Sequence, residues 1–313
     1  MSGSVTVVIP TRDRAGLLRQ TLRSVREQTV PPAQVVVADD GSTDDTERVV
    51  SEAGALRIHR PGGGWGPAGA RNAAMEQVGT ELVAFLDSDD LLLPDALEAL
   101  QRALSDAPGA PFAFGRGLAA HVDDGRWVSE GLIGPDPGEL EDPLGAIFAR
   151  NSVPSGGALV RATAFRQVGG YDEEVEWSED HNLWIRLARL GRPVYVEDLI
   201  CVHRRHRGNR HTPRLAALDS PKLAELSRAE PSLQPWLPKR HGVELCEVAI
   251  GVAKEEPLRI PATVRRLMRG QRGKRAILVH GARHFAARRR WAREGRRLLD
   301  TRTDLRGWLS SYS

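Results

Sequence analysis

The sequence predicts an α/β protein: a mostly parallel sheet with helices on both faces, followed by a C-terminal helical region. The first part rests on short runs of β-branched residues that alternate with helical segments. A second observation is that two of these runs end in clusters of acidic residues, and a third is that the sequence after Pro213 becomes Arg-rich and helical in pattern. We therefore expect one domain over residues 1–212 and a basic, helical region over 213–313.

The elements follow from local patterns. Short apolar runs that end at Pro, Gly or acidic residues predict strands at 5–10, 35–40, 56–60 and 82–87. Helical spacing of apolar residues predicts helices around 17–25, after Thr43, at 70–78 and at 94–106. The pattern weakens over 107–150, where we expect a variable insert or surface loop with short strands. It then predicts a strand and a helix over 153–170, a helix at 177–191 and a last strand at 193–206.

Composition limits the class of protein. The chain has 313 residues, of which 41% are apolar and 27% charged, and this suffices for a substantial core. Two cysteines cannot form a disulfide framework, no apolar run reaches 18 residues, and the N-terminal residues lead directly into a strand without a leader-like pattern. We expect a cytoplasmic protein.

Charge is unevenly distributed. Residues 259–306 hold 16 basic residues against three acidic ones, so an acidic body carries a basic tail. Arg mixed with Phe285, Trp291 and Leu298 is typical of helices that contact the inner membrane face peripherally. The alternative is an ordinary helical cap with an exposed Arg-rich face. We expect no nucleic-acid partner because no recognition motif accompanies the charge. The helices of this region could also mediate oligomer formation.

Acidic residues gather where two predicted strands end. One cluster is Asp39-Asp40 and the other is Asp87-Ser88-Asp89-Asp90. Ligands of such sheets bind at the carboxyl ends of the strands, so these carboxylates are expected to converge on one edge, at adjacent strand ends. Like charges repel, and the convergence therefore predicts a cation or a group of hydrogen-bond donors at that edge.

Six motifs in order together resemble the family 2, GT-A-fold glycosyltransferases, whose Rossmann-like sheet is mostly parallel. The resemblance covers about residues 1–210 and does not extend to 213–313. The motifs are VVIPTRDRAGLLRQTLRSVREQT, VVVADDGSTDDT, GPAGARNAAM, LVAFLDSDDLLLPDAL, VGGYDEEVEWSEDHNLWIRLARLG and HRRHRGN.

The resemblance implies roles for the acidic clusters. The family's Asp-x-Asp motif falls on Asp87 and Asp89, which makes Asp89 a ligand of Mn²⁺ or Mg²⁺. Asp87 would contact ribose or a metal-bound water, with Ser88 in the same nucleotide site. Asp90 is expected to cap the next helix. Asp39 resembles the nucleobase contact, whereas Asp40 is interpreted as a turn residue.

Further nucleotide contacts are implied outside these clusters. Arg71, after the Gly/Pro loop 62–69, would meet the base or a phosphate oxygen. The base pocket would be lined by Pro10, Thr11 and Arg12, although Thr11 could equally be a helix cap.

The Glu179-Asp180 pair resembles the family's acceptor-side acids. In an inverting mechanism one carboxylate removes the proton of the acceptor hydroxyl, and we assign Asp180 as that base, with Glu179 positioning substrate. Trp177 could be a sugar platform, and Trp184 could be a platform or core. Asn182 departs from the family, which often has Asp there.

The stretch 203–209 matches the family's Arg-x-His pattern at Arg204 and His206. His206 could complete the metal site, or Arg204 and Arg207 could bind the diphosphate. A solvated basic loop is the alternative.

Together these features predict an inverting, metal-assisted glycosyltransferase that moves a sugar from a nucleotide-diphosphate sugar to a hydroxyl acceptor. UDP is the favoured donor nucleotide, and the acceptor could be a glycan, a lipid-linked glycan or a small molecule. One alternative is a nucleotidyltransferase of related fold, although its Gly-rich signature is missing from VVIPTRDRAGLL. Another is a nucleotide-sugar-binding protein without turnover.

Overall fold

The computed structural model describes residues 3–175, 178–206, 230–244, 246 and 274–313. These residues build one nine-stranded sheet with the order β3-β2-β1-β4-β8-β6-β9-β5, and β7 pairs with β6. The strands are β1 Val5–Thr11, β2 Gln34–Asp39, β3 Leu56–His59, β4 Leu82–Phe85, β5 Leu91–Leu92, β6 Phe112–Asp123, β7 Arg126–Ile133, β8 Ala158–Arg161 and β9 Val194–Arg204.

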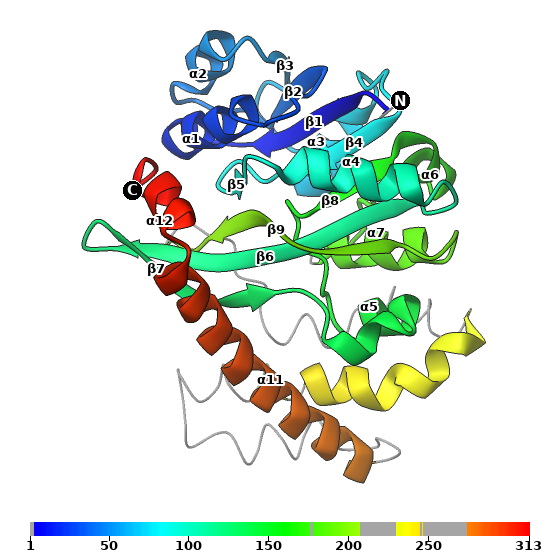
Figure 1. Ribbon diagram of the computed structural model, residues 1–313. Coiled ribbons are helices and arrows are strands. Elements are labelled where there is room, and N and C mark those ends of the chain that lie inside the picture. The colour runs from blue at the N-terminus through cyan, green and yellow to red at the C-terminus, as the bar shows by residue number, and fades with distance from the viewer. Residues whose placement is uncertain (1–2, 176–177, 207–229, 245, 247–273) are drawn as a thin grey trace.

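Helices cover both faces of the sheet (Figure 1). Alternate side chains of each strand point to opposite faces, so Val7 and Ile9 enter one core with α1, α2 and α4, while Val8 enters the other with α3, α6 and α7. The helices are α1 Ala15–Arg26, α2 Thr46–Glu52, α3 Gly66–Met75, α4 Ala96–Asp106, α5 Pro143–Ala149, α6 Ala162–Gln167, α7 Glu179–Ala188, α11 Lys274–Thr301 and α12 Thr303–Ser310, with 3₁₀ turns η1 Pro137–Leu140 and η2 Pro231–Trp236.

The N-terminal half is parallel, as the sequence predicts. β1 pairs in parallel with β2 on one side and with β4 on the other, and β2 pairs in parallel with β3. The two acidic clusters therefore reach one edge, but β1 separates them, so the expectation of adjacent strand ends is wrong in this detail. The end of β1 lies between the clusters, with Thr11 opposite Asp39.

The interpretation of 107–150 as an insert or surface loop is also wrong, although the strands expected within this stretch are confirmed as β6 and β7. β6 is 12 residues long and lies inside the sheet, where it pairs with β7, β8 and β9. Its sequence lacks the alternation of apolar and polar residues that marks a half-exposed strand, because β6 is buried on both faces for most of its length. β8 is antiparallel to β4 and β6, so the sheet is mixed in its second half.

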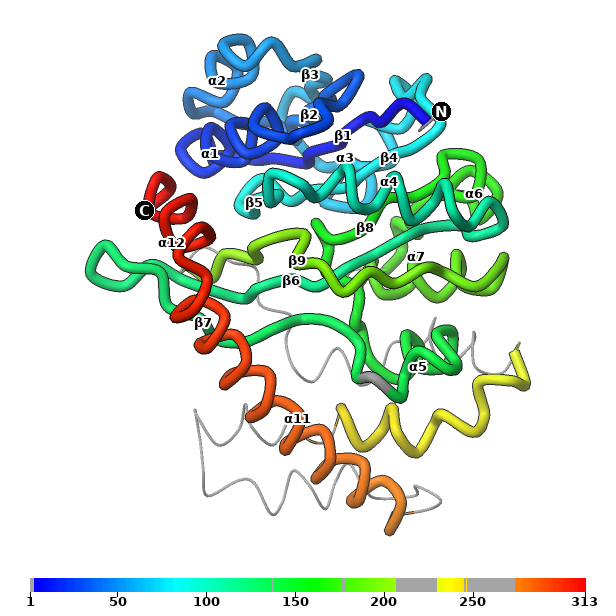
Figure 2. Tube along the Cα trace, viewed as in Figure 1, coloured from blue at the N-terminus to red at the C-terminus, as the bar shows by residue number. Residues whose placement is uncertain are grey.

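The C-terminal region is helical, as predicted, and packs on the sheet. α11 crosses β7 and α12 reaches α1 (Figure 2). Close approach to β7 requires Gly295, because a Cβ there would lie 2.3 Å from the Oγ of Ser129. Trp308 Nε1 and Tyr312 Oη both donate to Glu27, the residue that follows α1, at 3.1 and 2.6 Å. The boundary expected near residue 213 lies outside the described residues.

Candidate active site

The second acidic cluster meets a histidine from the last strand. Asp89 follows β4 and is buried, and its Oδ2 lies 2.9 Å from Nε2 of His206, which follows β9. Arg14 also donates to this Oδ2, at 2.6 Å. β9 runs beside β6 and also pairs antiparallel with β5. This pairing places His206, which follows β9, against Asp89, which precedes β5. The two side chains expected at a metal are therefore in contact.

The contact between Asp89 and His206 fits a divalent ion. Carboxylate oxygen and imidazole nitrogen both suit Mn²⁺, and two neighbouring ligands of an octahedral ion with bonds of about 2.1 Å lie roughly 3 Å apart. Among the residues that the structure describes, no group of three or more His, Cys, Asp or Glu could hold a metal. Two ligands from the protein suffice for an ion that takes its remaining ligands from phosphate oxygens and water.

Arg71 connects one acid expected on the donor side to one expected on the acceptor side. It projects from α3, is 4% exposed, and donates to Asp87 Oδ1 at 2.5 Å and to Glu179 Oε1 at 3.0 Å. Its guanidinium also lies 5.1 Å from the ring centroid of Tyr171. Its buried Nε–H finds no acceptor among the described residues. The guanidinium thus fixes the distance between two carboxylates that are 92 residues apart in the chain.

These surroundings shift the pKa of Asp87. Burial raises the pKa of Asp87 to about 6; the Arg71 charge opposes the rise, and the neighbouring Asp90 and Asp89 charges add to it. The charges of both carboxylates keep Arg71 protonated despite its burial, so its pKa is raised. A cation placed near Asp87 would favour the charged carboxylate and relieve the repulsion.

Glu179 and Asp180, the pair expected on the acceptor side, begin α7. Ser178, the residue before the helix, has φ +60° and ψ +37°, a left-handed conformation that is unusual for a residue with a Cβ. Asp180 Oδ2 accepts from Asn151 Nδ2 at 2.9 Å and from Ser155 Oγ at 3.2 Å. Burial, followed by the charge of Glu179, raises the pKa of Asp180. A carboxylate with a raised pKa is a better proton acceptor than an ordinary Asp.

The end of β1 forms a second polar group with the first acidic cluster. Asp39 is fully buried and its Oδ2 accepts two hydrogen bonds from Arg57, at 2.9 and 2.6 Å. Burial works to raise the pKa of Asp39, but hydrogen bonds from Ser42 and Arg57 outweigh it, so the pKa is lowered and the carboxylate stays charged. The hydroxyl of Thr11 is buried and has no hydrogen-bond partner among the described residues.

Pro10, Arg12 and Ser88 occupy the same edge. Pro10 precedes Thr11 in β1 and pairs in register with Ala38, and the side chain of Arg12 is 55% exposed. Ser88 is 3% exposed, and its carbonyl accepts from Thr21 Oγ1 of α1 at 2.9 Å. The buried serine places the backbone between Asp87 and Asp89 against α1.

The glycine loop closes over the first cluster. Asp40 accepts from the backbone N–H groups of Trp65 and Gly66, at 2.8 and 3.1 Å, and so holds the start of α3. Gly41 has φ +84°, and a Cβ there would lie 2.4 Å from the backbone nitrogen of Gly63. Only glycine allows this approach, and the structural role expected for Asp40 agrees with these contacts.

Two expectations require correction. Asp90 does not cap a helix: it is 1% exposed and accepts from the backbone N–H of Arg204 and from His203 Nδ1, both at 2.9 Å. Arg204 is 5% exposed, and its guanidinium donates to Asp89 O, Gln20 Oε1, Leu17 O and Thr21 Oγ1. These donors hold the loop after β4 against α1, so the interpretation of Arg204 as a diphosphate contact is not supported by its position.

Trp177 and Arg207 lie outside the described residues. Trp184 is core rather than a sugar platform, because it is fully buried. Asn182 is also buried and accepts from Arg186 Nε at 2.8 Å, so the position that often carries Asp in the family holds a neutral structural contact here.

Several side chains at the site are not found by sequence reasoning. Arg14, Arg57 and Asn151 each contact one of the acids. Arg14 lies in the first motif but no role is assigned to it there, whereas Arg57 and Asn151 come from segments that the motifs do not cover. Arg57 had a usable signal: it lies in the strand after the one that ends in Asp39, so a parallel pair brings them together. Asn151 had none, because the loop before β8 approaches α7 only in the folded chain.

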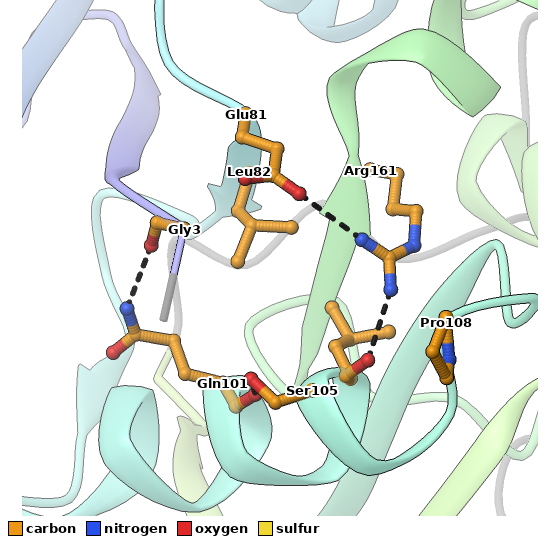
Figure 3. A pocket seen from close by; sticks show the side chains of 8 residues that line it. Gly3, Glu81, Leu82, Gln101, Ser105, Pro108 and Arg161 are labelled. Carbon is orange, nitrogen blue, oxygen red and sulfur yellow. Dashed lines mark hydrogen bonds and ion pairs between the residues drawn. The ribbon is translucent and has the colours of Figure 1, made fainter. Parts of the chain in front are cut away.

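A small hollow lies at the opposite edge of the sheet (Figure 3). It is lined by Gly3, Glu81, Gln101 and Arg161, among others. Its polar groups are satisfied by one another: Arg161 pairs with Glu81 at 3.3 Å and Gln101 donates to the carbonyl of Gly3 at 2.9 Å. It lies at the N-terminal ends of β1 and β4, away from the acids, and contributes nothing to the site.

Comparison with known proteins shows a similarity to one family in the N-terminal part of the chain. Residues 6–138 match the model of glycosyl transferase family 2. Residues 6–138 are therefore similar to a family 2 domain. It is 34% identical over 209 residues to the pre-mycofactocin glycosyltransferase of Mycobacterium tuberculosis, an alignment of 65% of this chain and 43% of that protein. It is 34% identical over 119 residues to a GalNAc(5)-diNAcBac-PP-undecaprenol β-1,3-glucosyltransferase of Campylobacter jejuni, covering 36% of this chain and 38% of that one. The alignments thus span less than half the length of these relatives.

Solved structures share the fold of the chain. A mannosyltransferase from Pyrobaculum calidifontis, in complex with GDP-Man and Mn²⁺, covers 94% of this chain and 84% of its own at 22% identity, with a TM-score of 0.60. Residues 1–349 of S. aureus TarS, in complex with UDP-GlcNAc, cover 85% and 91% at 18% identity, with a TM-score of 0.57. The GT-A fold expected from the motifs is confirmed.

Proposed function

We propose that this protein is an inverting family 2 glycosyltransferase that moves a sugar from a nucleotide-diphosphate sugar to a hydroxyl acceptor. The observation that carries the proposal is the Arg71 bridge, which joins Asp87 on the expected donor side to Glu179 on the expected acceptor side. A transferase must hold both substrates within bonding distance. The buried Arg71 guanidinium sets the spacing between the two acids that would contact them.

The donor nucleotide would lie along the edge between Asp39 and Asp87. Asp39 offers an acceptor and Arg57 a donor side by side, a pair that complements the N3–H and O4 of uracil. Pro10, Thr11 and Arg12 would line the base, and the unpartnered Thr11 hydroxyl supports a ligand there. We favour UDP. Asp87 and Ser88 would contact the ribose side.

Asp89 and His206 would hold the divalent ion, Mn²⁺ or Mg²⁺. When bound, such an ion neutralises the charge that grows on the diphosphate as it leaves. In this structure Arg14 shares Asp89 Oδ2 with His206, so the guanidinium of Arg14 would turn toward the diphosphate when the carboxylate binds the ion. Arg207 is an additional diphosphate contact in the proposal.

Asp180 would act as the base. Its carboxylate takes the proton of the acceptor hydroxyl as that oxygen attacks the anomeric carbon, and the bond from that carbon to the diphosphate oxygen breaks. Attack from the face opposite the leaving group inverts the anomeric configuration. Asn151 and Ser155 hold one oxygen of Asp180, which leaves the carboxylate fixed in orientation. Glu179, held by Arg71, and Trp177 would position the acceptor.

The acceptor would be a glycan, a lipid-linked glycan or a small molecule with a free hydroxyl. The name of the Campylobacter relative includes an undecaprenol-linked glycan, which supports the lipid-linked class. No helix among the described residues is long and apolar enough to cross a membrane. We also propose that the catalytic unit is 1–212 and that the helical region 213–313 supports it through α11 and α12.

The test is donor turnover. Purified protein is incubated with UDP-, GDP- and dTDP-sugars and Mn²⁺, and the released nucleoside diphosphate is measured with and without chelator. Asp89→Ala should abolish metal-dependent release, whereas Asp95→Ala, at an exposed helix start without a side-chain cap bond, should not. NMR of the product should show an inverted anomeric centre.

Other outcomes would replace the proposal. Pyrophosphate release from a nucleoside triphosphate and a sugar phosphate would identify a nucleotidyltransferase. Nucleotide binding by calorimetry without hydrolysis or transfer would identify a binding protein. Full metal-dependent turnover by Asp89→Ala would refute the assigned metal ligand.

A further inference from the structure

α11 has one face that the fold uses and one that it does not. The inward positions, which repeat every three or four residues, are buried: Ile277, Gly281, His284, Gly295 and Leu299. A second set of positions, offset from the inward ones by roughly 110° around the helix, repeats with the same spacing and is exposed throughout. They form what we call the outward stripe: Arg275, Leu278, Ala282, Phe285, Arg289, Arg293 and Arg296. A helix with this spacing presents them along one line, roughly 32 Å long at 1.5 Å per residue.

The charge of α11 is strongly positive and largely uncompensated. The helix holds nine Arg and Lys residues against Glu294 and Asp300. Arg290 pairs with Asp136 and with Glu294, at 3.6 Å for the latter. Within the described part of the chain, the arginines of the outward stripe form no ion pair. Among the residues that the structure describes, no acidic side chain therefore neutralises these charges.

The outward stripe and the neighbouring position Val279 also expose large apolar side chains. Leu278 is 51% exposed, Val279 42% and Phe285 48%, all in the first half of the helix. Leu278 and Phe285 are two turns apart and so lie on the same line as the arginines. A helix that only caps the domain gains nothing from exposing three large apolar groups beside unpaired cations. Exposed apolar side chains beside arginines are typical of a helix that lies in the interface of an anionic bilayer.

We propose that the outward stripe of α11 binds an anionic lipid surface. Arg289, Arg293 and Arg296 would meet lipid phosphates while Leu278 and Phe285 enter the boundary between headgroups and acyl chains. A second copy of the chain fits less well because its own arginines would face these. A soluble polyanion would neutralise the charge but leave the apolar side chains in water.

Binding of the outward stripe to a lipid surface would orient the edge of the sheet that carries the acidic clusters. α11 is fixed to β7 where Gly295 meets Ser129 and Gly131, and α12 continues to α1, whose N-terminal neighbour Arg14 contacts Asp89 (Figure 1). The helix and the acid edge thus belong to one packed body. The inference does not depend on the proposed transferase activity, because it concerns a surface away from the acids.

The experiment is vesicle co-sedimentation of the full chain. One set of vesicles is pure phosphatidylcholine and the other an equal mixture with phosphatidylglycerol. We expect binding to the anionic set only, weakened by salt. Arg289→Gln with Arg293→Gln and Arg296→Gln should lower the binding constant more than tenfold, since each arginine near an anionic surface contributes on the order of fivefold. The matched control changes Arg26, Arg48 and Arg102, exposed elsewhere, to Gln and should bind as the parent does.

A second pair of variants separates lipid from other partners. Leu278→Ser with Phe285→Ser should weaken vesicle binding but leave binding to soluble polyphosphate unchanged. Vesicle binding that survives both sets of variants would overturn the proposal. An equal loss of vesicle binding in the control variant would overturn the proposal in favour of nonspecific charge attraction. Concentration-dependent dimers that disappear in the Leu278 and Phe285 variant would overturn it in favour of self-association. Unchanged thermal melting and unchanged nucleotide binding show that each variant is folded.

Discussion

Replacing Arg71 by Met removes the cation that joins the two acid groups and keeps most of the side-chain volume. Asp87 and Glu179 would then face each other without a counter-charge, at side-chain exposures of 25% and 18%. We expect Arg71→Met to lower both the free energy of unfolding and turnover. The single neutral variants Asp87→Asn and Glu179→Gln should cost less, because each leaves Arg71 one partner.

The magnitude follows from the two contacts. At a charge separation near 4 Å and an effective dielectric constant of about 20, each pair attracts by roughly 4 kcal/mol. Desolvation of the guanidinium offsets most of this sum, and removal of one partner of a buried pair typically costs about 3–5 kcal/mol. Partial exposure lets water reach both carboxylates, so we expect a loss of about 3 kcal/mol in Arg71→Met.

The assay is a double-mutant cycle by urea denaturation. If the Arg71–Asp87 pair is a real interaction, Arg71→Met with Asp87→Asn should be more stable than the sum of the single losses predicts, by about 1–3 kcal/mol. Arg186→Met serves as the control, since that guanidinium contacts Asn182 and the carbonyl of Val168 rather than the acids. Additive losses within about 0.5 kcal/mol would refute the bridge, as would undiminished turnover in Arg71→Met.

Three further predictions concern the metal, the base and the C-terminal contact. Asp89→Asn should weaken Mn²⁺ binding in the presence of UDP by about a hundredfold or more in calorimetry; unchanged affinity would exclude Asp89 as ligand. Burial and the charge of Glu179 raise the pKa of Asp180, so kcat/KM should fall as the pH drops through that raised pKa. Asn151→Ala removes a hydrogen-bond donor to the charged carboxylate and should therefore move this acidic limb of the pH profile to higher pH. A limb that moves to lower pH would contradict the assignment of Asp180 as the base. Glu27→Ala removes the hydrogen-bond acceptor of Trp308 and Tyr312 and should lower the free energy of unfolding by about 2 kcal/mol. Urea denaturation measures this loss, and calorimetry should show an unchanged affinity for Mn²⁺. An unchanged stability would show that α12 is held by its apolar contacts alone.

Local patterns in the sequence determined most of the first half of the fold. Apolar runs, helical spacing and turn residues are short-range signals, so β1, β2 and α1 appear within a few residues of their predicted bounds. The acids at the ends of β2 and β4 could be foreseen at one edge, because parallel strands place their carboxyl ends together. The contact of Asp89 with His206 agrees with the motif assignment, although the motif alone does not give the distance.

Only the tertiary structure decided how the acids are partnered. The local pattern predicts short strands within 107–150, but the place of β6 inside the sheet depends on its pairing with β7, β8 and β9. For the same reason Asp90 supports β9 instead of capping a helix, and Arg204 supports α1 instead of facing the site.

The Arg71 bridge shows the division most clearly. The sequence by itself supplied the three charged residues Asp87, Glu179 and Arg71, each in a recognisable motif. That one guanidinium donates to both carboxylates depends on how α3, β4 and α7 pack, and on the burial that makes two charge pairs strong enough to fix the site. Residue types are local information, whereas distances and burial arise only when segments far apart in the chain come together.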